Sequence, residues 1–169
     1  MIFLGLGANL PSVAHGEPIH TLSAALALLA ERGVSIVRRS RWFRTAPLPI
    51  SDQPWFINAV AAVETDLPPL ELLHLLQQIE RELGRERHER WGARVIDLDL
   101  LAYHNSVINP GVAGAELIVP HARLHERAFV LRPLQEIAPE WRHPRFGLRV
   151  DELQAALPPG QQVEPVGSG

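Results

Sequence analysis

Residues 95–103 read Val-Ile-Asp-Leu-Asp-Leu-Leu-Ala-Tyr, an apolar run that contains two of the five aspartates of the chain. The run predicts a buried strand, and residues two apart on a strand lie on one face with Cα atoms about 6.6 Å apart. Two ionised carboxylates on such a face repel each other unless a cation lies between them. Oxygen ligands favour Mg²⁺ over Zn²⁺, so Asp97 and Asp99 are predicted to hold one magnesium ion or two. The alternative is an exposed strand end with two solvated aspartates.

The segment before this strand is strongly basic, with four arginines in the eleven residues 84–94. A guanidinium group binds phosphate oxygens through two hydrogen bonds. A basic loop that leads into a metal-binding strand suits the transfer of a phosphate-bearing group. The alternative is a solvated loop in which Glu86 and Glu89 pair with the arginines. All 16 cationic residues are arginine, and the absence of lysine excludes a Gly-Lys-Ser/Thr phosphate loop and Schiff-base chemistry.

The composition is that of a packed protein without a strong charge. The chain has 169 residues, 46% of them hydrophobic, a net charge of −3 and a sequence pI of about 6.2. These values predict one domain and disfavour a general nucleic-acid or membrane-surface binder. The absence of cysteine excludes disulfides and thiolate catalysis. No apolar run approaches the roughly 20 residues that cross a bilayer, and residues 1–5 do not resemble a signal peptide, so a cytoplasmic protein is expected.

Apolar periodicity and turn residues predict the order of the elements. Strands are expected over residues 2–7, 34–44, 55–64 and 95–103, and helices over 20–32, 68–83, 128–137 and 150–157. Residues 45–54 contain three prolines and predict a loop. Strands that alternate with helices indicate an α/β or α+β sandwich. We expect a single domain over residues 1–157 and a loose tail, rich in proline and glycine, over 158–169.

Two aromatic and two polar residues are further site candidates. Phe56 follows the proline-rich loop and precedes Asn58 by two positions. A flat heterocycle stacks on aromatic rings such as Phe56 or Phe129, while an amide hydrogen-bonds to its edge. For each phenylalanine the alternative is a place in the core. His121 follows Pro120 in a predicted loop, either as a phosphate contact or as an ordinary surface group.

Residues 90–101 read Arg-Trp-Gly-Ala-Arg-Val-Ile-Asp-Leu-Asp-Leu-Leu and resemble the signature of the 6-hydroxymethyl-7,8-dihydropterin pyrophosphokinase family of folate biosynthesis. The fixed spacing of arginines and aspartates makes this signature far more specific than a bare Asp-x-Asp pair. The resemblance extends over residues 1–155, with these supporting matches: Gly5-Leu6-Gly7-Ala8-Asn9-Leu10, Phe43-Arg44-Thr45, Asp52-Gln53-Pro54, Asn58-Ala59, Gly84-Arg85, Val119-Pro120-His121, Arg127 and Phe129.

The resemblance implies a fold and a reaction. The fold is of the α+β class, a ferredoxin-like α/β sandwich with a mostly antiparallel sheet and helices packed on it, in a protein that is usually monomeric. The reaction passes an intact pyrophosphate from ATP to 6-hydroxymethyl-7,8-dihydropterin and gives AMP and the pterin diphosphate. By resemblance, Asp97 and Asp99 bind two Mg²⁺ ions that bridge the triphosphate. The implied partners are these two small molecules, and neither nucleic acid nor a membrane.

The resemblance also assigns roles to individual residues. Arg85 and Arg94 take the place of the family's phosphate-handling arginines, and Trp91 helps to close their loop. Nucleotide contacts are expected at Gln77, Glu80, Arg87, Trp91, Arg94, Leu100, His121 and Arg127. Pterin contacts are expected at Thr45, Pro47, Leu48, Phe56, Asn58 and Phe129, with the two phenylalanines on either side of the ring. Gln77 and Glu80 are three apart on a predicted helix and therefore share one face.

The chain departs from the family pattern at four positions where alanine replaces a more common residue: Ala8, Ala46, Ala93 and Ala122. None of them is a metal ligand or a signature arginine. Two other functions remain open on the residues alone. One is a different magnesium-dependent nucleotidyl or glycosyl transferase that shares the Asp-x-Asp pair. The other is a ferredoxin-like module that binds a nucleotide without catalysis. The product formed from ATP distinguishes these two functions from the pyrophosphokinase reaction.

Overall fold

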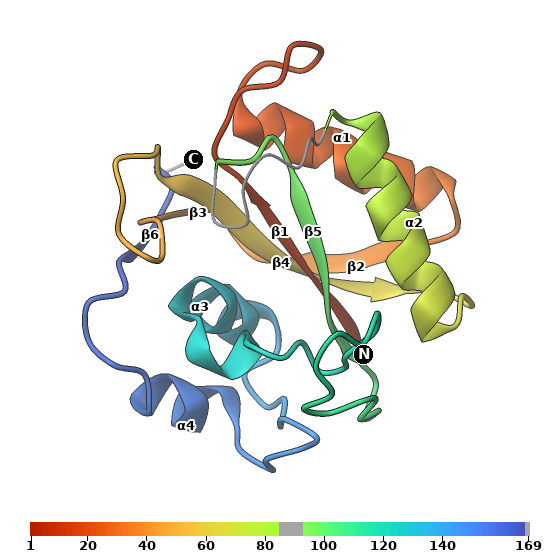
Figure 1. The fold of residues 1–169 in the computed structure, drawn as a ribbon, viewed down its shortest axis with the longest axis vertical. Helices are drawn as coiled ribbons and strands as arrows, with labels where there is room; N and C mark the ends of the chain where they lie inside the picture. Colours follow the sequence, from red (N-terminus) through yellow and green to blue (C-terminus); the bar gives the residue numbers. More distant parts are fainter. Residues whose placement is uncertain (85–92, 168–169) are drawn as a thin grey trace.

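An antiparallel sheet runs through the centre of the molecule, as Figure 1 shows. The computed structural model describes residues 1–84 and 93–167. In this part of the chain the strands pair in the order β5-β1-β4-β3-β6, and β2 pairs with β4. The strands are Ile2–Ala8 (β1), Ser35–Arg39 (β2), Phe43–Thr45 (β3), Phe56–Glu64 (β4), Asp97–Tyr103 (β5) and Val163–Pro165 (β6). The helices are Pro18–Glu31 (α1), Pro69–Glu82 (α2), Ala128–Ile137 (α3) and Val150–Ala155 (α4), with a 3₁₀ turn over Leu124–Glu126.

The first two thirds of the chain follow the ferredoxin-like order of strand, helix, two strands, helix and strand. When β2 and β3 are taken as two parts of one strand, the order is β1, α1, β2/β3, β4, α2 and β5. All the strand pairs among the described residues are antiparallel. The predicted α+β class with a mostly antiparallel sheet is therefore confirmed.

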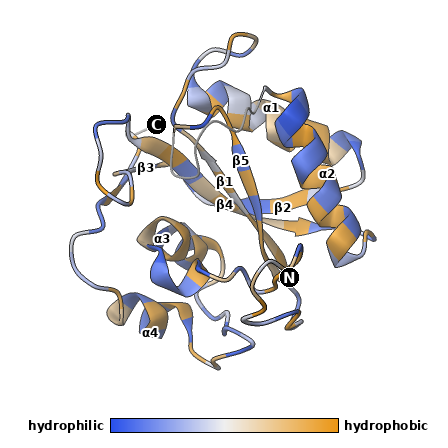
Figure 2. Cartoon of the chain, in the orientation of Figure 1, coloured by the Kyte–Doolittle hydropathy of each residue, from blue (hydrophilic) through white to orange (hydrophobic). Residues whose placement is uncertain are grey.

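Helices cover both faces of the sheet, because the buried strands carry apolar residues on both sides (Figures 1 and 2). On one face the core joins β1 residues such as Leu4 and Leu6 to α1 and α2. On the other face Phe3 and Leu101 pack with Leu131 and its neighbours on α3. Among the described residues, the structure contains no helix with both the length and the hydrophobicity needed to cross a membrane.

Proline and glycine set the ends of the first two helices. Both α1 and α2 begin on a proline, Pro18 and Pro69, whose fixed φ suits the first helical turn and whose missing N–H is not needed there. Gly33 and Gly84 follow the helix ends with φ of 87° and 97°, values that favour glycine. The first helix begins at Pro18, two residues before the predicted start at residue 20.

The prediction of one strand over residues 34–44 is wrong, because the chain breaks at Ser40 into β2 and β3. Ser40 is only 2% exposed. Its hydroxyl accepts the backbone N–H of Val60 at 3.0 Å and donates to the carbonyl of Arg41 at 2.8 Å. A side chain thus takes over hydrogen bonding that a regular ladder makes through the backbone. The apolar pattern did not reveal this break, because it depends on one hydroxyl group.

We predict that Ser40→Ala lowers the free energy of unfolding by about 1–3 kcal/mol, because the buried N–H of Val60 loses its acceptor. Urea unfolding followed by circular dichroism measures the loss. Ser35→Ala on the exposed start of β2 is the matched control and should change the stability by less than about 0.5 kcal/mol. Equal effects of the two substitutions would contradict the role of Ser40.

The prediction that residues 158–169 are loose is wrong for the part that forms β6. β6 pairs with β3 and extends the sheet by one strand. Nearby, the Gln161 side chain accepts the first N–H of α3 from Ala128 at 2.8 Å and donates to the carbonyl of Glu126 at 3.0 Å. These contacts join distant parts of the chain, so composition alone missed them. The domain boundary at residue 157 stays a prediction.

A turn after α3 is built around the buried ring of His143. Its Nδ1 accepts the backbone N–H groups of Arg145 and Phe146 at 3.2 and 3.3 Å. The ring stacks on Phe146 with a centroid distance of 4.4 Å. Burial, followed by the charges of His125 and Arg145, lowers the pKa of His143 from 6.5 to about 4. The turn therefore requires the neutral imidazole.

We predict that the protein loses stability as the pH falls from about 6.5 to about 4, where the unfolded His143 binds a proton and the folded one does not. The loss levels off below the folded pKa. His143→Asn keeps an acceptor near the position of Nδ1 but does not titrate, so its melting temperature should fall less over this range. Differential scanning calorimetry at several pH values compares the two proteins. An identical pH dependence of both would contradict the assignment.

Candidate active site

Two glycines on the central strand open a hollow on the face of the sheet that α3 partly covers. Gly7 on β1 pairs with Asn58 on β4 and, on its other side, with Asp97 on β5. Gly5 pairs in the same way with Asp99. Cross-strand partners share one face of a sheet, so the amide, the glycines and the two carboxylates lie on the same face.

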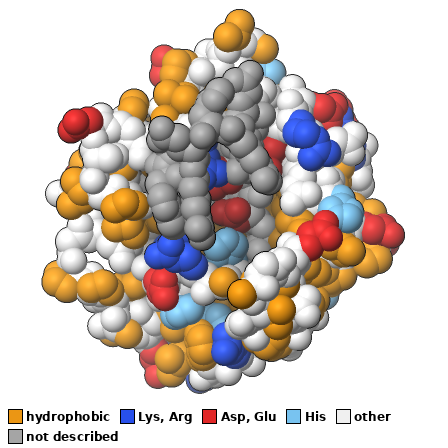
Figure 3. Space-filling view, in the orientation of Figure 1, with side chains coloured by type: hydrophobic (Ala, Val, Ile, Leu, Met, Phe, Trp, Pro, Cys, Tyr) orange, Lys and Arg blue, Asp and Glu red, His pale blue; other side chains and the backbone are white. Residues whose placement is uncertain are grey.

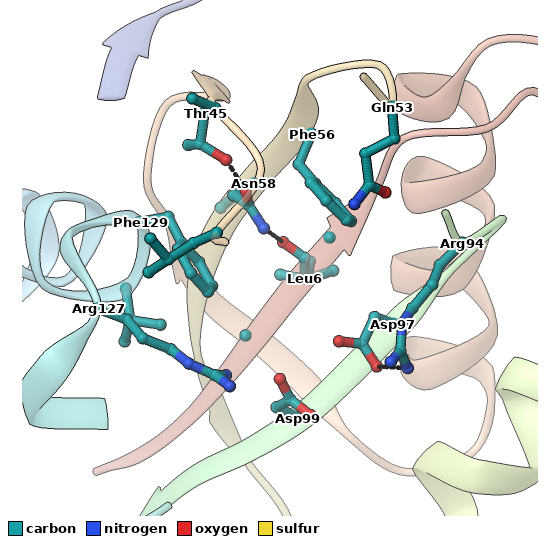
Figure 4. A pocket seen from close by; sticks show the side chains of 16 residues that line it. Leu6, Thr45, Gln53, Phe56, Asn58, Arg94, Asp97, Asp99, Arg127 and Phe129 are labelled. Atoms are coloured by element: carbon teal, nitrogen blue, oxygen red, sulfur yellow. Dashed lines mark hydrogen bonds and ion pairs between the residues drawn. The ribbon is translucent and has the colours of Figure 1, made fainter. Parts of the chain in front are cut away.

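The hollow has a polar half and an aromatic half (Figure 4). It is lined by Gly5, Leu6, Gly7, Thr45, Ala46, Leu48, Gln53, Phe56, Asn58, Ala59, Arg94, Asp97, Asp99, Arg127, Phe129 and Val130. The residues come from β1, β3, β4, the segment before β5, β5 itself, the start of α3 and the proline-rich loop. Because no single element supplies the site, the sheet pairing decides its geometry.

The two aspartates lie at the start of the edge strand β5 and are half-buried. Both line the hollow, as expected for residues two apart on a strand. Arg94 lies three residues before Asp97, and its Nη1 atom is 3.8 Å from a carboxylate oxygen of that residue. The alternative of two aspartates at an exposed strand end does not fit this half-buried arrangement beside an arginine.

Arg127 faces the aspartates from the other side of the hollow, at the N-terminal end of α3 (Figure 4). Burial lowers the pKa of its guanidinium group, and the charges of Asp99 and Asp97 partly oppose that shift. A guanidinium group stays protonated at neutral pH despite such a shift. On the face drawn in Figure 3, acidic, arginine and histidine side chains gather near the middle of the molecule.

The side chain of His121 lies near Arg127 and Asp97 and is neutral. Its Nδ1 accepts the backbone N–H of Arg123 at 3.1 Å, and its own backbone N–H donates to the carbonyl of Leu101. Burial and then the charge of Arg127 lower the pKa of His121 from 6.5 to about 4, against an opposing effect of Asp97. A neutral imidazole whose Nδ1 accepts a hydrogen bond carries its hydrogen on Nε2. The ring therefore offers one donor and no positive charge.

The aromatic half contains five of the six predicted pterin contacts. Thr45, Leu48, Phe56, Asn58 and Phe129 line the hollow. Figure 4 shows Phe56 and Phe129 on opposite sides of Asn58. The sixth, Pro47, is buried and lines a neighbouring groove instead.

The hydrogen bonds of Asn58 hold its amide in place. The Thr45 hydroxyl donates to Asn58 Oδ1 at 2.5 Å, and Asn58 Nδ2 donates to the carbonyl of Leu6 at 3.3 Å. The amide therefore lies across the gap that Gly7 leaves on the central strand.

Three predicted nucleotide contacts lie away from the hollow. Leu100 is buried in the core on the opposite face of β5, among residues of α1 and α2. Glu80 on α2 is buried, and its carboxylate accepts the backbone N–H of Leu98 at 2.7 Å. Gln77, one turn earlier, is half-buried. Glu80 thus holds the outer edge of β5 between the two aspartates. Three further predicted residues, Arg85, Arg87 and Trp91, lie outside the residues that the structure describes.

Sequence reasoning assigned no role to Asn9, which connects three segments of the site. Its Nδ2 donates to the Gln53 side chain and to the carbonyl of Pro54, both at 2.9 Å. Its Oδ1 accepts the backbone N–H of Arg94 at 2.7 Å, and its own N–H donates to the Arg94 carbonyl at 3.0 Å. The asparagine thus ties the end of β1 to the proline-rich loop and to the segment before β5. The signals in the sequence were a polar residue directly after a buried strand and its place in the family match over residues 5–10.

We predict that Asn9→Ala lowers the free energy of unfolding by about 1–3 kcal/mol, because part-buried hydrogen-bonding groups in the proline-rich loop and before β5 lose their partner. Faster proteolysis within residues 46–54 should accompany the loss, since the loop is released. Asn105→Ala, at an exposed asparagine, is the control. Unchanged stability and proteolysis of Asn9→Ala would show that the network does not hold the loop.

Two carboxylates, nearby guanidinium groups and an amide between aromatic rings have the chemistry to bind a polyphosphate next to a flat heterocycle. A family model described as 7,8-dihydro-6-hydroxymethylpterin-pyrophosphokinase (HPPK) matches residues 3–139. The chain therefore belongs to the HPPK family, and the resemblance drawn from the signature is confirmed.

Individual relatives agree with this assignment. The chain is 45% identical over 139 residues to 2-amino-4-hydroxy-6-hydroxymethyldihydropteridine pyrophosphokinase of Methylorubrum extorquens, covering 82% of both chains. It is 41% identical over 158 residues to the protein of the same name from Pseudomonas aeruginosa, covering 93% of this chain and 91% of the relative. It also matches the folic acid synthesis protein fol1 of Pneumocystis carinii at 38% identity, covering 88% of this chain but 19% of that protein.

Solved structures support the fold. The structure is similar to Plasmodium falciparum HPPK-DHPS A437G/K540E with pterin and p-hydroxybenzoate, with a TM-score of 0.72 and 16% sequence identity. The match covers 91% of this chain and 42% of that one, so the chain spans less than half of the HPPK-DHPS chain. At this identity the similarity concerns the fold alone, and it confirms the predicted ferredoxin-like architecture.

Proposed function

We propose that this chain transfers the pyrophosphoryl group of ATP to 6-hydroxymethyl-7,8-dihydropterin and releases AMP and the pterin diphosphate. The observation that carries the proposal is the row formed by Asn58, Gly7 and Asp97 on three neighbouring strands. Two strand spacings separate the Cα atoms of Asn58 and Asp97 by about 10 Å. A bicyclic ring held at the amide is long enough to bring a hydroxymethyl arm on its far end close to the carboxylates.

Asp97 and Asp99 fit a magnesium site that the nucleotide completes. Among the described residues no group of three or more His, Cys, Asp or Glu side chains forms a metal site on its own. Magnesium typically binds through one or two carboxylates together with substrate phosphates and water. We propose that two ions bind with the triphosphate. When bound, they neutralise phosphate charge and make the β-phosphorus more electrophilic.

The cationic side chains bind the triphosphate. Arg94 and Arg127 approach the hollow from opposite sides, and their guanidinium groups hydrogen-bond to phosphate oxygens. His121 donates from Nε2 without adding charge. Arg85, Arg87 and Trp91, in the basic segment before Arg94, are proposed to complete the phosphate site.

The reaction follows from this placement. The hydroxyl oxygen of the pterin attacks the β-phosphorus, and the bond from that phosphorus to the oxygen bridging to the α-phosphate breaks. AMP leaves with the bridging oxygen, and the hydroxyl proton passes to solvent. Arg94 and Arg127 stabilise the charge that moves toward the leaving oxygen. Phe56, Phe129 and the exposed Leu48 line the place of the ring and limit the access of water, which otherwise competes as the acceptor.

The nucleoside part of ATP is proposed to pass the edge of β5. Gln77 and Glu80 lie on α2, on the far side of that edge strand from the hollow, and Leu100 faces the same side. A nucleotide with its phosphates at Asp97 and Asp99 reaches these residues only around the edge. Among the described residues no further strand pairs beyond β5, and the Glu80 carboxylate occupies the N–H of Leu98 on this edge. We further propose that the protein acts as a cytoplasmic monomer.

The test is to incubate the protein with Mg-ATP and 6-hydroxymethyl-7,8-dihydropterin and to identify the nucleotide product by chromatography. AMP together with the pterin diphosphate supports the proposal. ADP, or AMP attached to an acceptor, would indicate another transferase. Binding of ATP without turnover would indicate a nucleotide-binding module.

We predict that Asp97→Asn and Asp99→Asn each lower the rate at least about 100-fold, because the metal loses a charged ligand. The melting temperature should be retained, since both side chains are half-buried at the hollow and not in the core. Asp66→Asn, at an exposed aspartate, is the matched control. Wild-type rates in both site variants would contradict the assignment of Asp97 and Asp99 as magnesium ligands.

A further inference from the structure

We propose that Gly7 is a positioning residue that holds the Asn58 amide in one orientation and thereby decides which heterocycle edge the hollow accepts. The inference rests on the proposed function and deepens it. It concerns a residue that contributes no side chain of its own. The evidence for this inference is the space above Gly7 and the hydrogen bonds of the Asn58 amide.

Space, and not backbone conformation, requires glycine at this position. A Cβ atom added to Gly7 would lie 2.5 Å from Asn58 Nδ2, a distance that real Cβ atoms do not tolerate. Gly7 is not among the residues with positive φ, so its backbone accepts an L-amino acid. Gly5, two residues earlier on the same face, differs. A Cβ there meets the Leu101 side chain at 3.4 Å, which is close to ordinary contact.

Two hydrogen bonds determine which way the amide points. Asn58 Nδ2 donates to the carbonyl of Leu6, and Asn58 Oδ1 accepts from the Thr45 hydroxyl. In the flipped orientation Oδ1 would face the Leu6 carbonyl, and two acceptors would repel each other. Because the Leu6 carbonyl precedes Gly7 directly in the chain, the amide reaches it only across the space that Gly7 leaves.

The Asn58 amide, held by these two hydrogen bonds, retains one donor and one acceptor for a ligand. An asparagine side chain offers two N–H donors and two carbonyl lone pairs. The hydrogen bonds within the described part of the chain use one of each. The remaining N–H and lone pair belong to one amide group, which lines the hollow and is 8% exposed. They match a ring edge that presents a carbonyl or imine acceptor next to an N–H donor. Such an edge defines a lactam or aminopyrimidine type of heterocycle.

A methyl group at residue 7 should displace this amide and leave the phosphate site unchanged. Gly7→Ala moves Asn58 Nδ2 away from the Leu6 carbonyl, so the amide no longer presents its donor and acceptor in line with the ring. Loss of aligned buried hydrogen bonds should lower kcat/KM for the pterin about 10–100-fold. Binding of Mg-ATP in the absence of pterin should stay within about twofold, because the metal and arginine side chains are untouched.

A double-mutant cycle with Asn58→Ala tests whether Gly7 acts through the amide. In the Asn58→Ala background the new methyl meets no Nδ2 atom, so Gly7→Ala should lower kcat/KM for the pterin by less than about twofold more. Gly5→Ala is the matched comparison on the same strand. Its effect, whatever its size, should add to that of Asn58→Ala, because its methyl meets Leu101 and not the amide.

The outcomes separate this inference from the proposed function. Additive effects of Gly7→Ala and Asn58→Ala, or wild-type kinetics of Gly7→Ala, would overturn the inference while leaving the reaction intact. If Gly7→Ala alone does not fold, the double variant should fold, and its failure to do so would also overturn the inference. If the wild type forms no AMP, the proposed function fails. The same cycle, measured by calorimetric binding of 6-hydroxymethylpterin, still shows whether Gly7 and Asn58 are coupled.

Discussion

The architecture of the site depends on the central strand β1, which has side chains on one face and almost none on the other. Toward α1 and α2 it presents Ile2, Leu4 and Leu6, which fill a continuous core. Toward α3 it presents Phe3 and then Gly5 and Gly7. A central strand is paired on both sides and cannot move away from the sheet, so missing side chains on one face leave a hollow that the fold itself keeps open.

Charge balance explains the surroundings of this hollow. Two half-buried carboxylates on one strand repel each other, and Arg94 and Arg127 lie on either side to compensate. His121 is held neutral in the same region by burial and by the nearby arginines. The site therefore contains fixed cations at its walls and a concentrated negative charge at one position, which suits a cation and a polyphosphate that arrive together.

Two buried amides, Asn9 and Asn58, do much of the positioning, and both act on groups distant in the chain. Asn9 connects the proline-rich loop to the segment before β5. Asn58 lies across β1 and joins the Thr45 hydroxyl to the Leu6 carbonyl. A buried amide is stable only when its donors and acceptors are paired. Each asparagine therefore holds a specific arrangement of the site, beyond what apolar packing alone would specify.

The sequence by itself determined the family, most of the elements and the shared face of Asp97 and Asp99. Local periodicity gives the strands and helices, and the spacing of Asp97 and Asp99 gives a shared face, because both follow from neighbours along the chain. Only the tertiary structure decided that Ser40 breaks a strand, that β6 extends the sheet, and that Leu100 faces away from the hollow toward Glu80. It also showed that a Cβ atom at residue 7 would lie 2.5 Å from Asn58 Nδ2. These features depend on contacts between residues far apart in the chain, and local sequence patterns do not encode such contacts.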